Sequence, residues 1–162
     1  MRTMKWLLIC TVLAGAVSAS SAPKTQIPPG RDLIDTAMSV HKFDTFLGLA
    51  RDADLIFYLK GSGPFTIFAP TEAAFNEFPG ALLQAIKGDD VRLRQFVLHH
   101  VVLGSYTVGQ ALRMHSLTAL DGRKLVLRNV GGHGTIDGAG FSIANIQASN
   151  GTLHGIDTLM LP

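Results

Sequence analysis

Cysteine is almost absent from this sequence. The only one, Cys10, lies near the N-terminus, and Ile9 precedes it, where a lipid-modified cysteine would have a small residue. We therefore expect no lipid anchor. Beyond Cys10 the chain has no thiol, so the domain can form neither a disulfide nor a thiolate metal site. It must hold together by packing alone.

An excess of charge of one sign is also lacking. The chain has 14 Lys and Arg against 12 Asp and Glu, and two of the basic residues, Arg2 and Lys5, fall within the first 19 residues. The remaining chain is balanced, with 12 of each sign. A neutral domain has no electrostatic basis for binding nucleic acid or an anionic membrane surface. With 47% apolar residues it can nevertheless bury a core.

Long apolar runs are scarce, and the clearest is WLLICTVLAGAV at residues 6–17. It is shorter than the ~20 apolar residues of a membrane span. It follows Arg2 and Lys5 and precedes Val17-Ser18-Ala19, which has small residues where a signal peptidase cleaves. We interpret residues 1–19 as a secretory signal, 20–31 as a flexible Pro-rich linker and 32–162 as one domain. The expected product is free and soluble, without stable membrane insertion after signal cleavage.

Catalytic motifs are missing as well. There is no G-x-S-x-G nucleophile elbow and no phosphate-binding loop. GGHG at residues 131–134 and DGAG at 137–140 are typical of turns between strands. Asp89 and Asp90 resemble paired catalytic acids, but Arg92 and Arg94 follow them, and helix capping explains the pair better. The sequence predicts no enzymatic activity and no cofactor.

Helical patterns dominate the first part of the domain. Asp32 can cap a helix whose apolar positions run from Leu33 to Met38, and a second helical stretch extends over residues 42–60. Thr71 can cap a third helix, which Pro79-Gly80 ends, and a further helix begins near Asp89 or Asp90.

The second part of the domain has the pattern of strands and tight turns. Asp121-Gly122, Asp137-Gly138 and Asn150-Gly151 each separate short alternating or apolar runs, as in β-hairpins. An earlier run at residues 65–69 alternates as a strand does. Helices followed by strands predict an α+β fold with mixed or antiparallel pairing.

Two adjacent histidines, His99 and His100, pose the main functional question. On a helix over residues 91–100, His100 shares an apolar face with Leu93, Phe96 and Val97, whereas His99 lies on the more polar face. Neighbouring helical residues diverge by about 100°, so the two rings cannot easily share a metal ion. We expect a buried, neutral, hydrogen-bonded His100, an exposed His99, and no metal site.

Three segments together resemble the fasciclin domain family. GPFTIFAPTEAAFNEFP at residues 63–79 is similar to its first signature, and ASNGTLHGIDTLMLP at 148–162 is similar to its second. Between them LHHVVLGSYT, residues 98–107, occupies the place of the Tyr-His segment. The resemblance implies a β-sheet wedge of about seven strands with a group of packed N-terminal helices.

The resemblance also implies roles for particular residues. His100 and Asp157 match the family's His and its acid in the closing segment, and the other structural motif residues are Thr71, Asn150, Gly151 and His154. His99 stands where the family usually has Tyr, and Asn145-Ile146 stands where adhesive animal members have Asp-Ile. The amide of Asn145 argues against integrin-type recognition. The candidate interaction surface comprises His99, Tyr106, Asn145 and Ile146.

The implied function is adhesion or matrix binding, of bacterial type, by a secreted or periplasmic module without catalysis. Its expected partner is a cell-surface or matrix protein or a polysaccharide. The alternatives are a periplasmic binding or scaffolding domain for a polysaccharide or small ligand, and an uncharacterised hydrolase. Asn150-Gly151-Thr152 matches the N-glycosylation pattern, although occupancy within a tight hairpin is not expected.

Overall fold

The computed structural model describes residues 30–162, so the expected secretory signal and most of the linker lie outside the described residues. Described residues form seven helices. Their bounds are α1 Leu33–Val40, α2 Asp44–Asp52, α3 Ile56–Leu59, α4 Glu72–Glu77, α5 Gly80–Lys87, α6 Asp90–His99 and α7 Val108–Met114.

Seven strands form a single mixed sheet within the same residues, in the order β2-β1-β7-β6-β5-β4-β3. Their bounds are β1 Phe65–Pro70, β2 Val101–Leu103, β3 Ser116–Thr118, β4 Lys124–Val130, β5 His133–Ile136, β6 Ala139–Ala148 and β7 Gly151–Ile156. Only β1 and β7 pair in parallel, and the other neighbours are antiparallel. A bridge between Val102 and Ala119 brings the two edge strands together and nearly closes the sheet. The predicted α+β class is confirmed.

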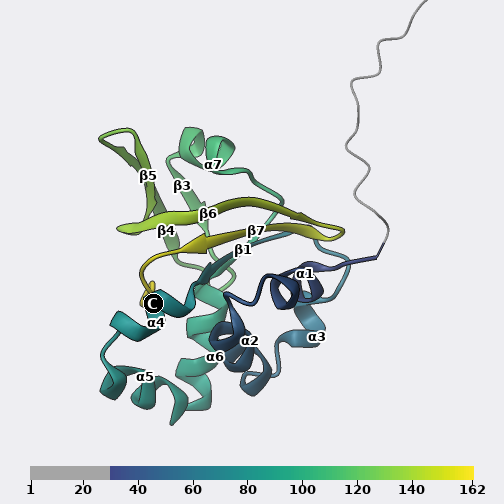
Figure 1. The fold of residues 1–162 in the computed structure, drawn as a ribbon, viewed down its shortest axis with the longest axis vertical. Helices are drawn as coiled ribbons and strands as arrows, with labels where there is room; N and C mark the ends of the chain where they lie inside the picture. The colour runs from purple at the N-terminus through teal and green to yellow at the C-terminus, as the bar shows by residue number, and fades with distance from the viewer. Residues whose placement is uncertain (1–29) are drawn as a thin grey trace, which may run out of the picture.

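The helices lie mainly on one side of the sheet (Figure 1). Helices α1–α6 gather below it in this view, whereas α7 lies on the opposite side near β3 and β4. The helix-side core contains buried residues of α1, α2 and α6 and one face of β1 and β7, among them Phe43, Phe46, Leu49, Phe96 and Leu153. A second, sheet-side core contains residues of most strands and of α7, among them Phe68, Leu125, Leu127, Ile136 and Ile156.

Strands β1 and β7 are buried along their whole length. The expected alternation is present in β1, since Phe65, Ile67 and Ala69 belong to the helix-side core and Phe68 to the sheet-side core. Both faces are covered, because the sheet curves round the second core. These two strands therefore join the cores into one structure.

Several helix boundaries follow the sequence signals, and others do not. Asp32 caps α1, where its Oδ1 accepts a hydrogen bond from the Asp35 N–H at 2.9 Å. The single helical stretch expected over residues 42–60 is wrong. It divides into α2 and α3 because Asp54 adopts a left-handed conformation with φ 58°, which lets both Ala53 and Leu55 turn into the core.

The region around Pro79-Gly80 also differs from the prediction. The motif ends α4 as expected, but Pro79 then serves as the N-cap position of α5, a helix that the sequence reading missed. Thr71 occupies the N-cap position of α4 without a side-chain capping bond, so that part of the capping prediction is wrong. Its backbone N–H instead donates to the Ile156 carbonyl oxygen at 3.0 Å, which ties α4 to the end of β7.

Candidate functional site

His100 is fully buried at the C-terminal end of α6, as predicted. Its Nε2 accepts a hydrogen bond from the Met160 N–H at 3.3 Å, so the proton is on Nδ1, which donates to the Phe96 carbonyl oxygen at 2.7 Å. The Phe96 ring packs on it with centroids 4.5 Å apart. Burial lowers the pKa of His100 to about 3, since an imidazolium would be poorly solvated there. Both nitrogens are used internally, so His100 cannot act on a ligand.

His154 has the same kind of environment in β7. Its Nδ1 accepts from the Asn145 N–H at 3.0 Å, and its Nε2–H donates to the Tyr106 carbonyl oxygen at 2.8 Å. The ring stacks on Phe68 in the neighbouring strand, with centroids 5.4 Å apart. Burial lowers the pKa of His154 below its ordinary value. This histidine links the turn before α7 to strand β6.

Three of the four candidate surface residues lie near His154. Asn145 is exposed and left-handed, with φ 59°, and its Oδ1 accepts from the Val108 N–H at the start of α7 at 3.0 Å. The half-buried ring of Tyr106 lies over Gly104. A Cβ added at Gly104 would lie 2.6 Å from this ring. Ile146 is half-buried and packs on the helix-side core. The backbone N–H groups of Tyr106 and Asn145 and Oδ1 of Asn145 make internal hydrogen bonds.

His99, the fourth candidate, is not on the surface, and the prediction of an exposed ring is wrong. It is only 2% exposed. Its Nδ1 lies 2.8 Å from Oδ2 of Asp121, whose carboxylate is itself buried. The polar face of α6 is covered here by the turns that contain Asp121 and Asp137. Local helical spacing shows which face is polar, but it cannot show that a distant turn folds over it.

The remaining motif residues make contacts within the fold. Asn150 accepts from the Leu33 N–H at 2.8 Å and donates to the carbonyl oxygens of Leu59 and Gly61 at 2.9 and 2.8 Å. A Cβ at Gly151 would overlap the Phe65 carbonyl oxygen. Asp157 lies just beyond β7, and its Oδ1 accepts from the Gly140 N–H at 2.7 Å. Asn150, Gly151 and Asp157 thus each make contacts that join separate segments of the fold.

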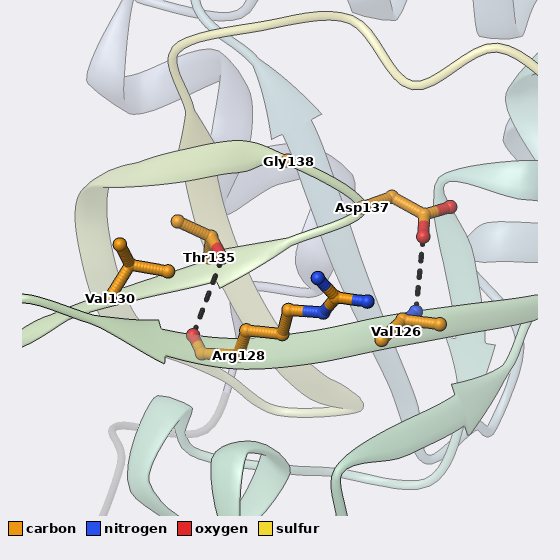
Figure 2. A pocket seen from close by; sticks show the side chains of 6 residues that line it. All are labelled: Val126, Arg128, Val130, Thr135, Asp137 and Gly138. Atoms are coloured by element: carbon orange, nitrogen blue, oxygen red, sulfur yellow. Dashed lines mark hydrogen bonds between the residues drawn. The ribbon is translucent and has the colours of Figure 1, made fainter.

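A shallow hollow of about 560 Å³ lies on the outer face of strands β4 and β5. We refer to it as the β4–β5 hollow. Figure 2 shows its lining, which comprises Val126, Arg128, Val130, Thr135, Asp137 and Gly138. Asp137 is held in place because its Oδ1 accepts from the Val126 N–H at 3.1 Å, and the Thr135 hydroxyl donates to the Arg128 carbonyl oxygen at 3.3 Å.

The sequence analysis did not predict this hollow. Val126 and Val130 are 41% and 60% exposed, and Arg128 lies between them on the same face. The signal was present, since Val126, Arg128 and Val130 alternate with the buried Leu125 and Leu127. The sequence pattern identifies Asp137 only as a turn residue.

Within residues 30–162, no three or more His, Cys, Asp or Glu side chains gather closely enough to form a metal site. In the same part of the chain, no helix combines the length and apolar character needed to cross a membrane.

Comparison with known proteins places these features in a family. The family model described as the fasciclin domain matches residues 41–162. The Synechocystis protein sll1735 is 28% identical over 130 residues, which cover 80% of this chain and 97% of that protein. The cell surface glycolipoprotein MPB83 of Mycobacterium bovis is 30% identical over 111 residues, covering 68% of this chain and 49% of the glycolipoprotein.

The fold has a counterpart among solved structures. A FAS1 domain pair from the insect cell adhesion molecule fasciclin I superimposes with a TM-score of 0.71 at 14% identity, covering 83% of this chain and 52% of that one. The structural match concerns the fold, and the family match extends over most of the described residues. The chain belongs to the fasciclin domain family.

Proposed function

We propose that this protein is a secreted or periplasmic adhesion module that binds a surface partner without catalysing a reaction. The cell surface glycolipoprotein and the insect adhesion molecule are named for their surface location and for adhesion respectively. The absence of catalytic spacing in the sequence agrees with a binding role. The expected signal over residues 1–19 supplies the route of export in this proposal.

The observation that carries the proposal is the contrast between the histidines and the β4–β5 hollow. His100 and His154 use both ring nitrogens in internal hydrogen bonds. The outer face of β4, in contrast, presents two exposed valines on either side of Arg128. The exposed valines and the Arg128 guanidinium suit a partner that presents an apolar surface and a carboxylate group. We propose that this partner is a cell-surface or matrix protein or a polysaccharide.

A small ligand is the second candidate, because a hollow of about 560 Å³ is within the size range of ligand pockets. Its shallow form favours a polymer or protein over a ligand that must be enclosed. The two candidates make different predictions. A small ligand would bind the isolated protein in solution, whereas a surface polymer would retain the protein on cells or on a glycan array.

The test is to measure binding of the purified protein to intact bacterial cells and to a glycan array, together with its Arg128→Ala and Val130→Ser variants. Both variants should bind at least about tenfold more weakly while their melting temperatures stay unchanged, since both side chains lie on the outer face. Leu82→Ser on α5, another exposed apolar site, is the matched control. Equal binding by all four proteins would exclude this face.

Catalysis is tested on the same preparation with a panel of ester and glycoside substrates. No turnover is expected. Turnover that persists through stringent purification would contradict the adhesion proposal and favour a hydrolase.

A further inference from the structure

We propose that His99 and Asp137 form a binding site for a transition-metal ion of the Zn²⁺ type, with Asp121 supporting the imidazole from behind. Nε2 of His99 is buried and has no hydrogen-bond partner among the residues that the structure describes. A buried polar atom without a partner is destabilising, and such an atom in a folded protein often indicates a ligand or water that belongs there.

Asp121 decides which nitrogen is available. Its Oδ2 lies 2.8 Å from Nδ1 of His99, and a carboxylate oxygen can only accept a hydrogen bond from that nitrogen. Nδ1 therefore carries a hydrogen, and Nε2 is the nitrogen left to face a ligand. Asp121 is held in turn, since its Oδ1 accepts from the Arg123 N–H at 3.0 Å. A carboxylate behind a ligating histidine is the usual arrangement in zinc proteins, where it orients the ring.

Asp137 supplies the second ligand on the other side of the ring. Its Oδ2 lies 3.7 Å from Nε2 of His99, so the buried nitrogen faces a carboxylate oxygen of a partly exposed side chain. A positive ion bound to both atoms makes that contact favourable. Two ligands each about 2.1 Å from a tetrahedral zinc ion are roughly 3.4 Å apart, close to the observed spacing. The Val126 N–H holds Oδ1 of Asp137, which leaves Oδ2 directed at His99.

The ligand types select the metal. Imidazole nitrogen with a carboxylate suits Zn²⁺ and similar ions, whereas Mg²⁺ and Ca²⁺ prefer oxygen ligands throughout. The protein supplies two ligands, in keeping with the absence of any cluster of three among residues 30–162. Water would fill the other positions. The Asp137 side chain is 30% exposed and lines the β4–β5 hollow, so these positions open toward solvent and an ion can enter there.

The test compares thermal melts of the purified protein at pH 7.5 with a chelator, with Zn²⁺ and with Mg²⁺. Zinc should raise the melting temperature by at least about 2 °C, because an ion that binds only the folded state stabilises it. Magnesium should not. Isothermal titration calorimetry should give one zinc ion per chain.

The deciding variant is Asp137→Asn. The Oδ1 of the new asparagine can still accept from the Val126 N–H, and its amide N–H can donate to Nε2 of His99. With a chelator present, the melting temperature of the variant should therefore be no lower than that of the parent. The response of the variant to zinc should be lost. His133→Ala and His115→Ala remove exposed histidines elsewhere and should keep the response.

Three results would overturn the proposal. One is a zinc response in Asp137→Asn equal to that of the parent, and another is an equal response to magnesium. The third is a melting temperature of the parent that does not rise with zinc.

Discussion

At the scale of single residues, the buried histidines show how one ring can hold two segments together. His100 connects Phe96 to Met160, and His154 connects Tyr106 to Asn145. In each ring one nitrogen donates to a carbonyl oxygen and the other accepts from a backbone N–H. Only the neutral imidazole can do both, so the protonation state is part of the structure.

His100→Ala should destabilise the protein by about 2–4 kcal/mol, because it leaves a cavity beside Phe96 and removes the partner of a buried backbone N–H. Urea unfolding at pH 7.5 measures this change. His115→Ala, at an exposed position, is the control and should stay within about 0.5 kcal/mol of the parent. Equal losses in the two variants would contradict a structural role for His100.

Acid should weaken the fold through the same ring. The folded pKa of His100 is about 3, below the unfolded value near 6.5. The unfolded chain therefore binds a proton first as the pH falls. The contribution is fully present above pH 6.5 and declines below it by about 1.4 kcal/mol per pH unit. The parent should lose about 2 kcal/mol more than His100→Ala between pH 7.5 and 5, measured by urea unfolding. Parallel curves would contradict this assignment.

At the scale of elements, side chains in turns fasten distant helices to the sheet. Asn150, in the β6–β7 turn, bonds to the start of α1 and to the end of α3. Glu72, in the first turn of α4, accepts from both the backbone N–H and the hydroxyl of Thr45 at 2.7 Å, which caps α2. Phe43, the N-cap residue of α2, has no side-chain acceptor, so the cap comes from another helix.

Asn150→Ala should lower stability by about 2–3 kcal/mol, since it removes three hydrogen bonds that join separate elements. Thermal and urea unfolding measure the loss. Ser149→Ala in the same turn, whose side chain is exposed, should have little effect. Both hydrogens of the Asn150 amide nitrogen are used, so we also expect no glycan there. A glycosylated, fully stable protein would contradict this role.

At the scale of the whole molecule, two cores share two strands. Strands β1 and β7 contribute alternate side chains to the helix-side and sheet-side cores. Neither core can lose these strands and remain buried. The molecule should therefore unfold as one cooperative unit although it has two hydrophobic centres.

Leu93→Ala in the helix-side core and Leu125→Ala in the sheet-side core test this coupling. Each leucine is fully or almost fully buried, so each variant should lose about 2–5 kcal/mol and shift a single transition. Far-UV and near-UV circular dichroism during urea unfolding should give coincident curves. Two separated transitions in either variant would show that the cores unfold independently.

Features that depend on neighbouring residues could be predicted from the sequence. Asp32 and Asp89 identify helix starts, and three Asp-Gly and Asn-Gly pairs identify hairpin turns, because capping and positive φ are local properties. The apolar face of residues 93–100 likewise predicted a buried His100. Helices followed by strands predicted the α+β class, and the signature segments identified the family.

What covers each polar face depends on the packing of distant segments and could not be predicted. His99 is buried because Asp121 and Asp137, 22 and 38 residues further along the chain, come from turns that fold over the end of α6. Strand β1 pairs with β7, more than 80 residues further along the chain, and is buried on both faces because the two cores lie on either side of it, whereas its alternation alone suggests one buried face. Helical spacing and strand alternation describe one element at a time, whereas burial depends on which distant elements pack against it.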